Sequence, residues 1–128
     1  MITLICGLPR AGKTTLSGNY KCKVYHGDYN MHKCYRVKDD VACVEGIFVT
    51  PSMREKVIRD REDFKLCVYL DTNREILSKR GFKNDNATCS EPTLEEGWDK
   101  IIIVKDNDYK NAKVIMKDSN LKGDLADG

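Results

Sequence analysis

The eight residues from Gly7 to Thr14 constrain the fold of this chain more strongly than any other feature of its sequence. They read GLPRAGKT and fit the pattern G-x-x-x-x-G-K-[ST], which forms a phosphate-binding loop between a strand and a helix. An apolar run at residues 2–6 precedes the loop, and residues 13–19 can continue as a helix. The loop therefore lies between a strand-like run and a helical stretch, as the pattern requires, which disfavours a chance glycine-rich turn.

This loop predicts a binding site for the phosphates of ATP. Glycines at both ends let the backbone approach an anion closely, and successive backbone N–H groups bind phosphate oxygens. Lys13 is expected to reach the β and γ phosphates, and the hydroxyl of Thr14 to bind Mg²⁺. We therefore predict ATP and Mg²⁺ as cofactors, with the nucleotide bound by Gly7, Leu8, Pro9, Arg10, Ala11, Gly12, Lys13, Thr14 and Thr15.

Short apolar runs farther along the chain predict the α/β fold class. Strand character is found at residues 23–26, 41–49, 66–70 and 100–104, and helical character at residues 52–63 and 73–79. Strands separated by helical crossovers form a parallel sheet with helices on both faces. We expect a P-loop NTPase fold with a five-stranded, mainly parallel sheet flanked by helices. Residues 114–116 are a candidate for a last edge strand.

Length and composition predict one folded domain over residues 1–128. Hydrophobic residues make up 41% of the chain and charged residues 33%, as in ordinary globular proteins. The net charge of +2 is too small to indicate nucleic-acid binding by bulk charge. No apolar run reaches the roughly 18 residues of a membrane span, so we expect a cytoplasmic protein with no membrane partner. Residues 105–128 are expected to form a peripheral strand and a flexible tail.

The six cysteines are scattered along the chain, and three of them lie inside apolar strand-like runs. We expect reduced, buried thiols that pack as small hydrophobic groups. Cys22, His26, His32 and Cys34 could in principle bind zinc. Their spacing lacks the paired Cys-x2-Cys units of structural zinc sites, so zinc binding is disfavoured.

Charged residues follow several predicted strands, at the edge of the sheet where α/β proteins bind ligands. Asp28 follows the second strand and could accept a proton from an attacking hydroxyl, or else cap the next segment. Glu45 lies in a buried run, where an unpaired acid is costly, so its expected partners are Mg²⁺-bound water, Lys13 or substrate. Arg54 and Arg80 could neutralise the transferred phosphate, or lie on solvated helix faces.

Several short blocks of the sequence resemble the small P-loop kinases related to 5′-hydroxyl polynucleotide kinase. Besides residues 7–14, these blocks are Gly27-Asp28-Tyr29, Glu45-Gly46 with residues 50–54, residues 70–80 and residues 91–101. The resemblance spans about residues 1–105. It implies phosphoryl transfer from ATP, with Asp28 as the general base, Arg80 as a lid arginine, and Arg54 as the substrate-side arginine after the third strand.

Three positions depart from the pattern of these kinases. Glu45 stands where they usually have aspartate, which keeps the carboxylate but changes its reach. Residues 29–40 are shorter than the region that helps bind the acceptor, which implies a smaller or differently held substrate. After Arg80, residues 82–85 offer only Lys83 as a further basic lid residue, which implies weaker charge stabilisation of the transferred group.

The sequence therefore predicts an ATP-dependent kinase that transfers the γ-phosphoryl group to a hydroxyl, on a nucleic-acid 5′ end or on a small metabolite. In this reading Lys13 and Arg80 hold the phosphoryl group, Thr14 binds Mg²⁺ and Asp28 takes the proton. Glu45 and Arg54 are the expected substrate residues, with Glu45 also able to reach Mg²⁺ through water. Two alternatives stay open: a reduced ATP-binding or ATPase regulatory module with little transfer activity, and a nucleoside monophosphate kinase.

Overall fold

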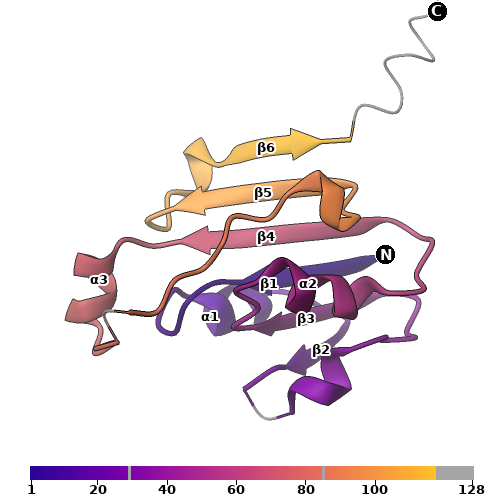
Figure 1. The fold of residues 1–128 in the computed structure, drawn as a ribbon, viewed down its shortest axis with the longest axis horizontal. Coiled ribbons are helices and arrows are strands. Elements are labelled where there is room, and N and C mark those ends of the chain that lie inside the picture. Colours follow the sequence, from indigo (N-terminus) through magenta and orange to yellow (C-terminus); the bar gives the residue numbers. More distant parts are fainter. Residues whose placement is uncertain (29, 85, 118–128) are drawn as a thin grey trace, which may run out of the picture.

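The computed structural model describes residues 1–28, 30–84 and 86–117, which form one six-stranded sheet flanked by helices (Figure 1). The strands are β1 (Ile2–Cys6), β2 (Lys23–His26), β3 (Ala42–Gly46), β4 (Lys65–Asp71), β5 (Lys100–Lys105) and β6 (Lys113–Met116). The helices are α1 (Lys13–Ser17), α2 (Pro51–Ile58) and α3 (Arg74–Lys79), with short 3₁₀ turns at Met31–Cys34, Leu94–Glu96 and Tyr109–Asn111. The tail expected after β6 lies outside the described residues.

The sheet has the order β2-β3-β1-β4-β5-β6, and all neighbouring strands are parallel except β5 and β6. The predicted α/β class and mainly parallel sheet are confirmed, although the sheet has six strands rather than five. The sixth strand is antiparallel because the chain reverses directly after β5. Asp106 and Asn107 adopt positive φ angles of 51° and 62°, and the turn Tyr109–Asn111 completes the reversal.

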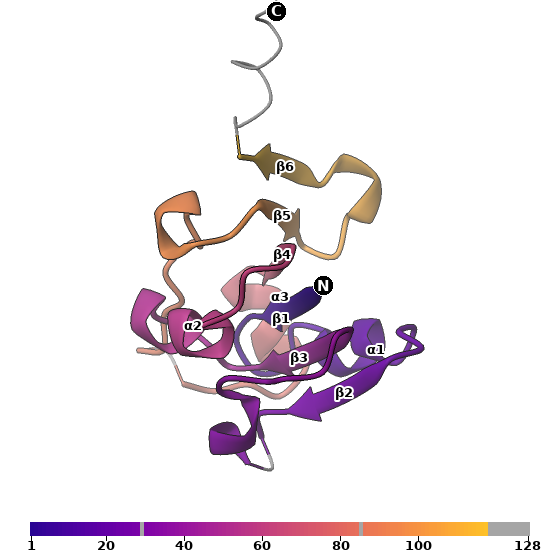
Figure 2. The ribbon, with the colours of Figure 1, turned by 90° about the vertical axis from the view of Figure 1, so that its right-hand side faces the viewer.

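Apolar side chains pack on both faces of the sheet because successive residues of a buried strand point to opposite sides. On one face Leu4 packs in a cluster with Val57 and Ile58 of α2. On the other face Ile5 packs with Leu77 of α3, and residues of α1 lie against the same cluster. Figure 2 shows α1 and α2 on opposite sides of β3. The expectation of helices on both faces is therefore correct.

Helix α2 is shorter than the predicted residues 52–63. It begins with a cap in which the Thr50 side chain accepts a hydrogen bond from the Met53 amide, followed by a proline at the first helical position. It ends at Ile58 because Asp60 has a φ angle of 71°, which an α-helix cannot accommodate. The residues after α2, which include Phe64 at 42% exposure, lead directly into β4.

The prediction of buried thiols is confirmed for four of the six cysteines, whereas Cys22 and Cys89 are half-buried. All six are free thiols, and Cys6, Cys43 and Cys67 are buried in β1, β3 and β4. Among the described residues, no group of three or more histidine, cysteine or acidic side chains could hold a metal ion. Within the same ranges, no helix is long and apolar enough to cross a membrane.

Candidate active site

The glycines of the loop between β1 and α1 let it curl tightly against the sheet. A Cβ atom at Gly7 would lie only 2.8 Å from the carbonyl oxygen of Leu70, on β4, so a side chain there would force the backbone to move. Gly12 has a φ angle of 105°, in the left-handed region that glycine adopts without strain. Arg10 also has a positive φ angle, of 73°. The loop thus returns sharply into α1, which starts at Lys13.

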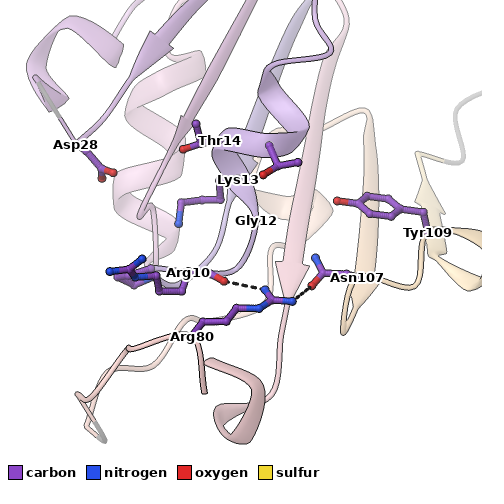
Figure 3. Close-up of a pocket in the computed structure, with 10 residues that line it drawn as sticks. Arg10, Gly12, Lys13, Thr14, Asp28, Arg80, Asn107 and Tyr109 are labelled. Carbon is purple, nitrogen blue, oxygen red and sulfur yellow. Dashed lines mark hydrogen bonds between the residues drawn. The ribbon is translucent and has the colours of Figure 1, made fainter. Parts of the chain in front are cut away.

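This loop forms one wall of a cavity of about 710 Å³, a size typical of small-ligand sites. The cavity is lined by Pro9, Arg10, Gly12, Lys13, Thr14, Thr15, Asp28, Arg80, Asn107 and Tyr109 (Figure 3). It brings together the three predicted catalytic residues and six of the nine predicted nucleotide-binding residues. Of the other three, Ala11 is fully buried, Gly7 packs against β4, and Leu8 lines a smaller cavity of about 390 Å³.

Lys13 is the central cation of the cavity, although only 6% of it is exposed. Its Nζ atom donates a hydrogen bond to the carbonyl oxygen of Leu8 at 2.8 Å. Burial lowers the pKa of Lys13, and the negative charges of Glu45 and Asp28 partly oppose this change. Arg10 and Arg80 line the same cavity, so its lining carries three cationic side chains against one carboxylate. This charge balance suits a polyanionic ligand.

Arg80 connects the end of α3 to the loop between β1 and α1. It donates hydrogen bonds to the carbonyl oxygen of Arg10 at 2.8 Å and to Oδ1 of Asn107 at 2.9 Å (Figure 3). Asn107 in turn donates from Nδ2 to the carbonyl oxygen of Ala11 at 3.0 Å. Three loops that are distant in sequence therefore meet at the edge of the cavity.

Asn107 and Tyr109 are cavity residues that the sequence analysis did not identify. Both follow β5, and the edge of the sheet beyond the carboxyl ends of the strands was the available signal. Figure 3 shows Asp28 and Tyr109 on opposite sides of Lys13, so the cavity extends from the end of β2 to the loop after β5. Asp28 is exposed at the first of these ends. Tyr29, which follows it in the sequence block Gly27-Asp28-Tyr29, lies outside the described residues.

Glu45 is almost completely buried near the end of β3, with 2% of it exposed. Its Oε2 atom lies 2.6 Å from Nδ1 of His26, while its Oε1 atom has no hydrogen-bond partner among the described residues. An orphaned carboxylate oxygen and the Thr14 hydroxyl are the oxygen donors that Mg²⁺ prefers. Glu45 does not itself line the cavity, but its negative charge acts on Lys13, which does. The chemistry of these oxygen donors therefore fits Mg²⁺.

The structure does not bring Arg54 to the cavity. Arg54 is fully buried at 0% exposure, and its guanidinium donates to both carboxylate oxygens of Glu96 at 2.8 and 2.9 Å. It also donates to the Phe48 carbonyl and the Ser90 hydroxyl, each at 2.9 Å. Burial lowers the pKa of this guanidinium, but its bonds to Glu96 outweigh that effect and raise it. The expected contact of Arg54 with substrate phosphate does not fit this geometry, because no part of the side chain is exposed.

The lid prediction concerned residues 82–85, which follow α3. Lys83 is exposed and is not part of the cavity lining, so Arg80 is the basic residue that this region contributes. Asp85 lies outside the described residues. Among the described residues of this region, Arg80 therefore lines the cavity without further basic side chains, and its guanidinium is hydrogen-bonded to Asn107 from the loop after β5.

Comparisons with known proteins support the fold. No protein-family model matches the sequence, and no curated protein matches it. A solved structure with a similar fold is that of an unliganded sugar kinase from Janibacter sp. HTCC2649. It aligns with a TM-score of 0.55 and 13% sequence identity, covering 81% of this chain and 84% of the sugar kinase chain. At this identity the likeness concerns the α/β fold alone.

Proposed function

We propose that this protein is an ATP-dependent phosphotransferase that moves the γ-phosphoryl group of ATP to a hydroxyl acceptor. The observation that carries the proposal is the cavity in which the phosphate-binding loop, Lys13 and Arg80 face Asp28. The loop and the cations suit ATP phosphates, whereas a carboxylate repels them and suits a hydroxyl. The name of the structural neighbour, a sugar kinase, agrees with this class of reaction.

Each residue of the cavity has a role that its chemistry supports. Lys13 binds the β and γ phosphates and, with Arg80, offsets the charge that develops on the transferred group. Thr14 would hold Mg²⁺ directly and Glu45 through water, and the ion would neutralise phosphate charge when bound. Asp28 accepts the proton of the attacking hydroxyl as the new P–O bond forms and the bond to the β-phosphate oxygen breaks.

Asp28 and Tyr109 line opposite ends of the cavity, which favours one substrate at each end. The acceptor hydroxyl approaches from the Asp28 side, since the proton must pass directly to its carboxylate. The nucleoside part of ATP then extends toward Asn107 and Tyr109, which line the opposite end. In this proposal the acceptor is a nucleic-acid 5′ end or a small hydroxyl compound.

A second candidate function is an ATP-binding module with little transfer activity. Residues 80–84 contribute one basic residue, Arg80, to the cavity lining. Weak charge stabilisation of the transferred group favours this second function. Arg80 is already hydrogen-bonded to Arg10 and Asn107, so it would have to exchange these partners to reach a transferred phosphate. A nucleoside monophosphate kinase is a separate alternative, in which the acceptor is a phosphate oxygen in place of a hydroxyl.

The two functions separate in a transfer assay with γ-labelled ATP, Mg²⁺ and a panel of acceptors. The panel contains 5′-hydroxyl oligonucleotides, sugars, nucleosides and nucleoside monophosphates. We expect label on a hydroxyl acceptor, and its loss in Lys13→Ala but not in the matched control Lys79→Ala, an exposed lysine outside the cavity lining. Measurable ATP binding with no labelled acceptor would favour the binding module, whereas absence of ATP binding would contradict both functions.

A further inference from the structure

His26 and Glu45 form a contact pair near the carboxyl ends of β2 and β3. They lie opposite each other in the parallel register of β2 and β3. Glu45 shares the α1 side of the sheet with Cys43, two residues earlier on the same strand, and Cys43 packs in the cluster that includes residues of α1. The Nδ1 atom of His26 lies 2.6 Å from Oε2 of Glu45, and 35% of the His26 side chain is exposed. The register thus sets a half-exposed imidazole against a fully buried carboxylate.

The two oxygens of Glu45 are held differently. Because a carboxylate only accepts hydrogen bonds, Nδ1 of His26 carries the hydrogen and donates it to Oε2. Oε1 is buried without a hydrogen-bond partner among the described residues. Leaving a buried carboxylate oxygen unpaired costs free energy. The unpaired Oε1 therefore indicates a hydrogen-bonding or metal partner that is supplied when the substrates bind.

A glutamate side chain in this position needs an external restraint to aim one oxygen. It has one more rotatable bond than aspartate, so its carboxylate can sweep a larger volume. The bond from His26 removes this freedom by fixing Oε2, and the other oxygen is then fixed as well. Outer partners of this kind typically change metal affinity or activity by about 10- to 100-fold when removed.

We propose that His26 is a positioning residue, which holds the Glu45 carboxylate so that Oε1 faces the Mg²⁺ ion of the bound nucleotide. This inference rests on the proposed function for the identity of the nucleotide, but not on the identity of the acceptor. His26 acts through Glu45 and touches neither ATP nor acceptor. The negative charge of Glu45 also acts on Lys13, where it partly opposes the lowering of the pKa by burial.

The test compares His26→Leu, which removes the donor, with His26→Asn, whose side-chain amide can donate from nearly the position of Nδ1. Calorimetry gives the affinity of each variant for ATP with and without Mg²⁺. The Mg²⁺-dependent gain is the ratio of the ATP affinity with Mg²⁺ to that without it. We expect this ratio to be about 10- to 100-fold smaller in His26→Leu than in the wild type, with the Mg²⁺-free affinity unchanged. His26→Asn should retain most of the gain, and so should Glu55→Gln, an exposed acid on α2.

A merely structural role predicts a different result. His26→Leu would then lower the melting temperature but keep the full Mg²⁺-dependent gain when measured well below that temperature, which would overturn the proposal. A wild-type protein that binds ATP equally well with and without Mg²⁺ would overturn it too. In the Glu45→Gln background we expect His26→Leu to have no further effect on the gain, and an additive loss would contradict positioning through Glu45.

Failure of the proposed function remains distinguishable from failure of this inference. A wild-type protein that transfers label to no acceptor refutes the kinase proposal, yet its Mg²⁺-dependent ATP binding still reports on His26. If transfer does occur, the positioning role predicts a lower kcat in His26→Leu and recovery in His26→Asn. Equal kcat values in the wild type and His26→Leu would contradict it.

Discussion

Arg54 offers the sharpest test of how this fold uses a buried charge, because its guanidinium makes four hydrogen bonds and has no exposed surface. Its main partner is Glu96, in the turn that leads to β5. The Glu96 carboxylate also accepts a bond from Nε1 of Trp98 at 3.1 Å. The Arg54→Met substitution would keep an unbranched aliphatic side chain and remove all four of these hydrogen bonds.

The expected cost follows from the carboxylate that is left behind. Glu96 is only 5% exposed, so without Arg54 it becomes a buried charge with reduced compensation, which costs about 3–5 kcal/mol. For a chain of this length, 1 kcal/mol shifts the melting temperature by roughly 3–5 °C. We therefore expect Arg54→Met to lower the melting temperature by roughly 10–25 °C.

Thermal unfolding followed by circular dichroism measures this loss, and Arg59→Met is the matched control. Arg59 follows the same helix and pairs with Glu55, but both side chains are about 40% exposed, at 42% and 40%. Exposed pairs of this kind contribute little to stability because solvent screens them, so Arg59→Met should change the melting temperature by only a few degrees. The double variant Arg54→Met/Glu96→Leu should recover part of the loss, because it removes the unpaired charge.

A melting temperature of Arg54→Met close to that of the wild type would mean that the buried Arg54–Glu96 pair is not needed for stability. If the same variant then raised KM for the acceptor, Arg54 would be a substrate residue, as the sequence resemblance implied. A large loss of stability in Arg59→Met would also contradict the argument, because it would mean that exposure does not separate the two arginines.

Three further predictions concern the site and the fold. Asp28→Asn should lower kcat by about 100-fold or more while leaving ATP affinity, measured by calorimetry, nearly unchanged; a fall in affinity with normal kcat would make Asp28 a structural cap. Gly7→Ala should lower the melting temperature, because its Cβ would lie 2.8 Å from the Leu70 carbonyl oxygen, and an unchanged melt would contradict that contact. Hydrogen bonds from Arg61 are the largest cause of the lowered pKa of Asp63, so its stabilisation is complete above its ordinary value of 3.8 and is lost as the pH falls. Urea midpoints at pH 7 and pH 3 should therefore differ less in Asp63→Asn than in the wild type, and equal differences would exclude this carboxylate as a source.

The strands could be predicted from the sequence because their signals are local. β1 and β2 have the predicted bounds, since each is a short run of strand-forming residues that ends at a glycine or just before one. The end of α2 could not be predicted in this way. The predicted helix continues to residue 63, but the backbone leaves the helix after Ile58, with a ψ angle of 133° at Arg59 and a positive φ angle at Asp60.

The cavity residues also differ in whether a local sequence signal identifies them. Lys13 and Arg80 could be predicted, because one belongs to a sequence motif and the other follows a short helix after a strand. Asn107 and Tyr109 could not, since they lie more than ninety residues beyond the loop that they face, and no local pattern connects them. Their position is fixed by the order of the strands, which brings the ends of β1 and β5 to one edge of the sheet.

The two charges that the sequence assigned to the substrate, Glu45 and Arg54, are both buried, and the difference between them is the completeness of their partners. Arg54 is bonded by Glu96 and by groups 6 and 36 residues away along the chain, so the fold itself compensates the charge. Glu45 has one oxygen bonded by His26 and one without a partner among the described residues. A buried charge costs free energy in either case. When the chain supplies every partner, as it does for Arg54, the charge can serve the fold alone. When one carboxylate oxygen has no partner in the chain, as in Glu45, we expect the missing partner to arrive with the ligand.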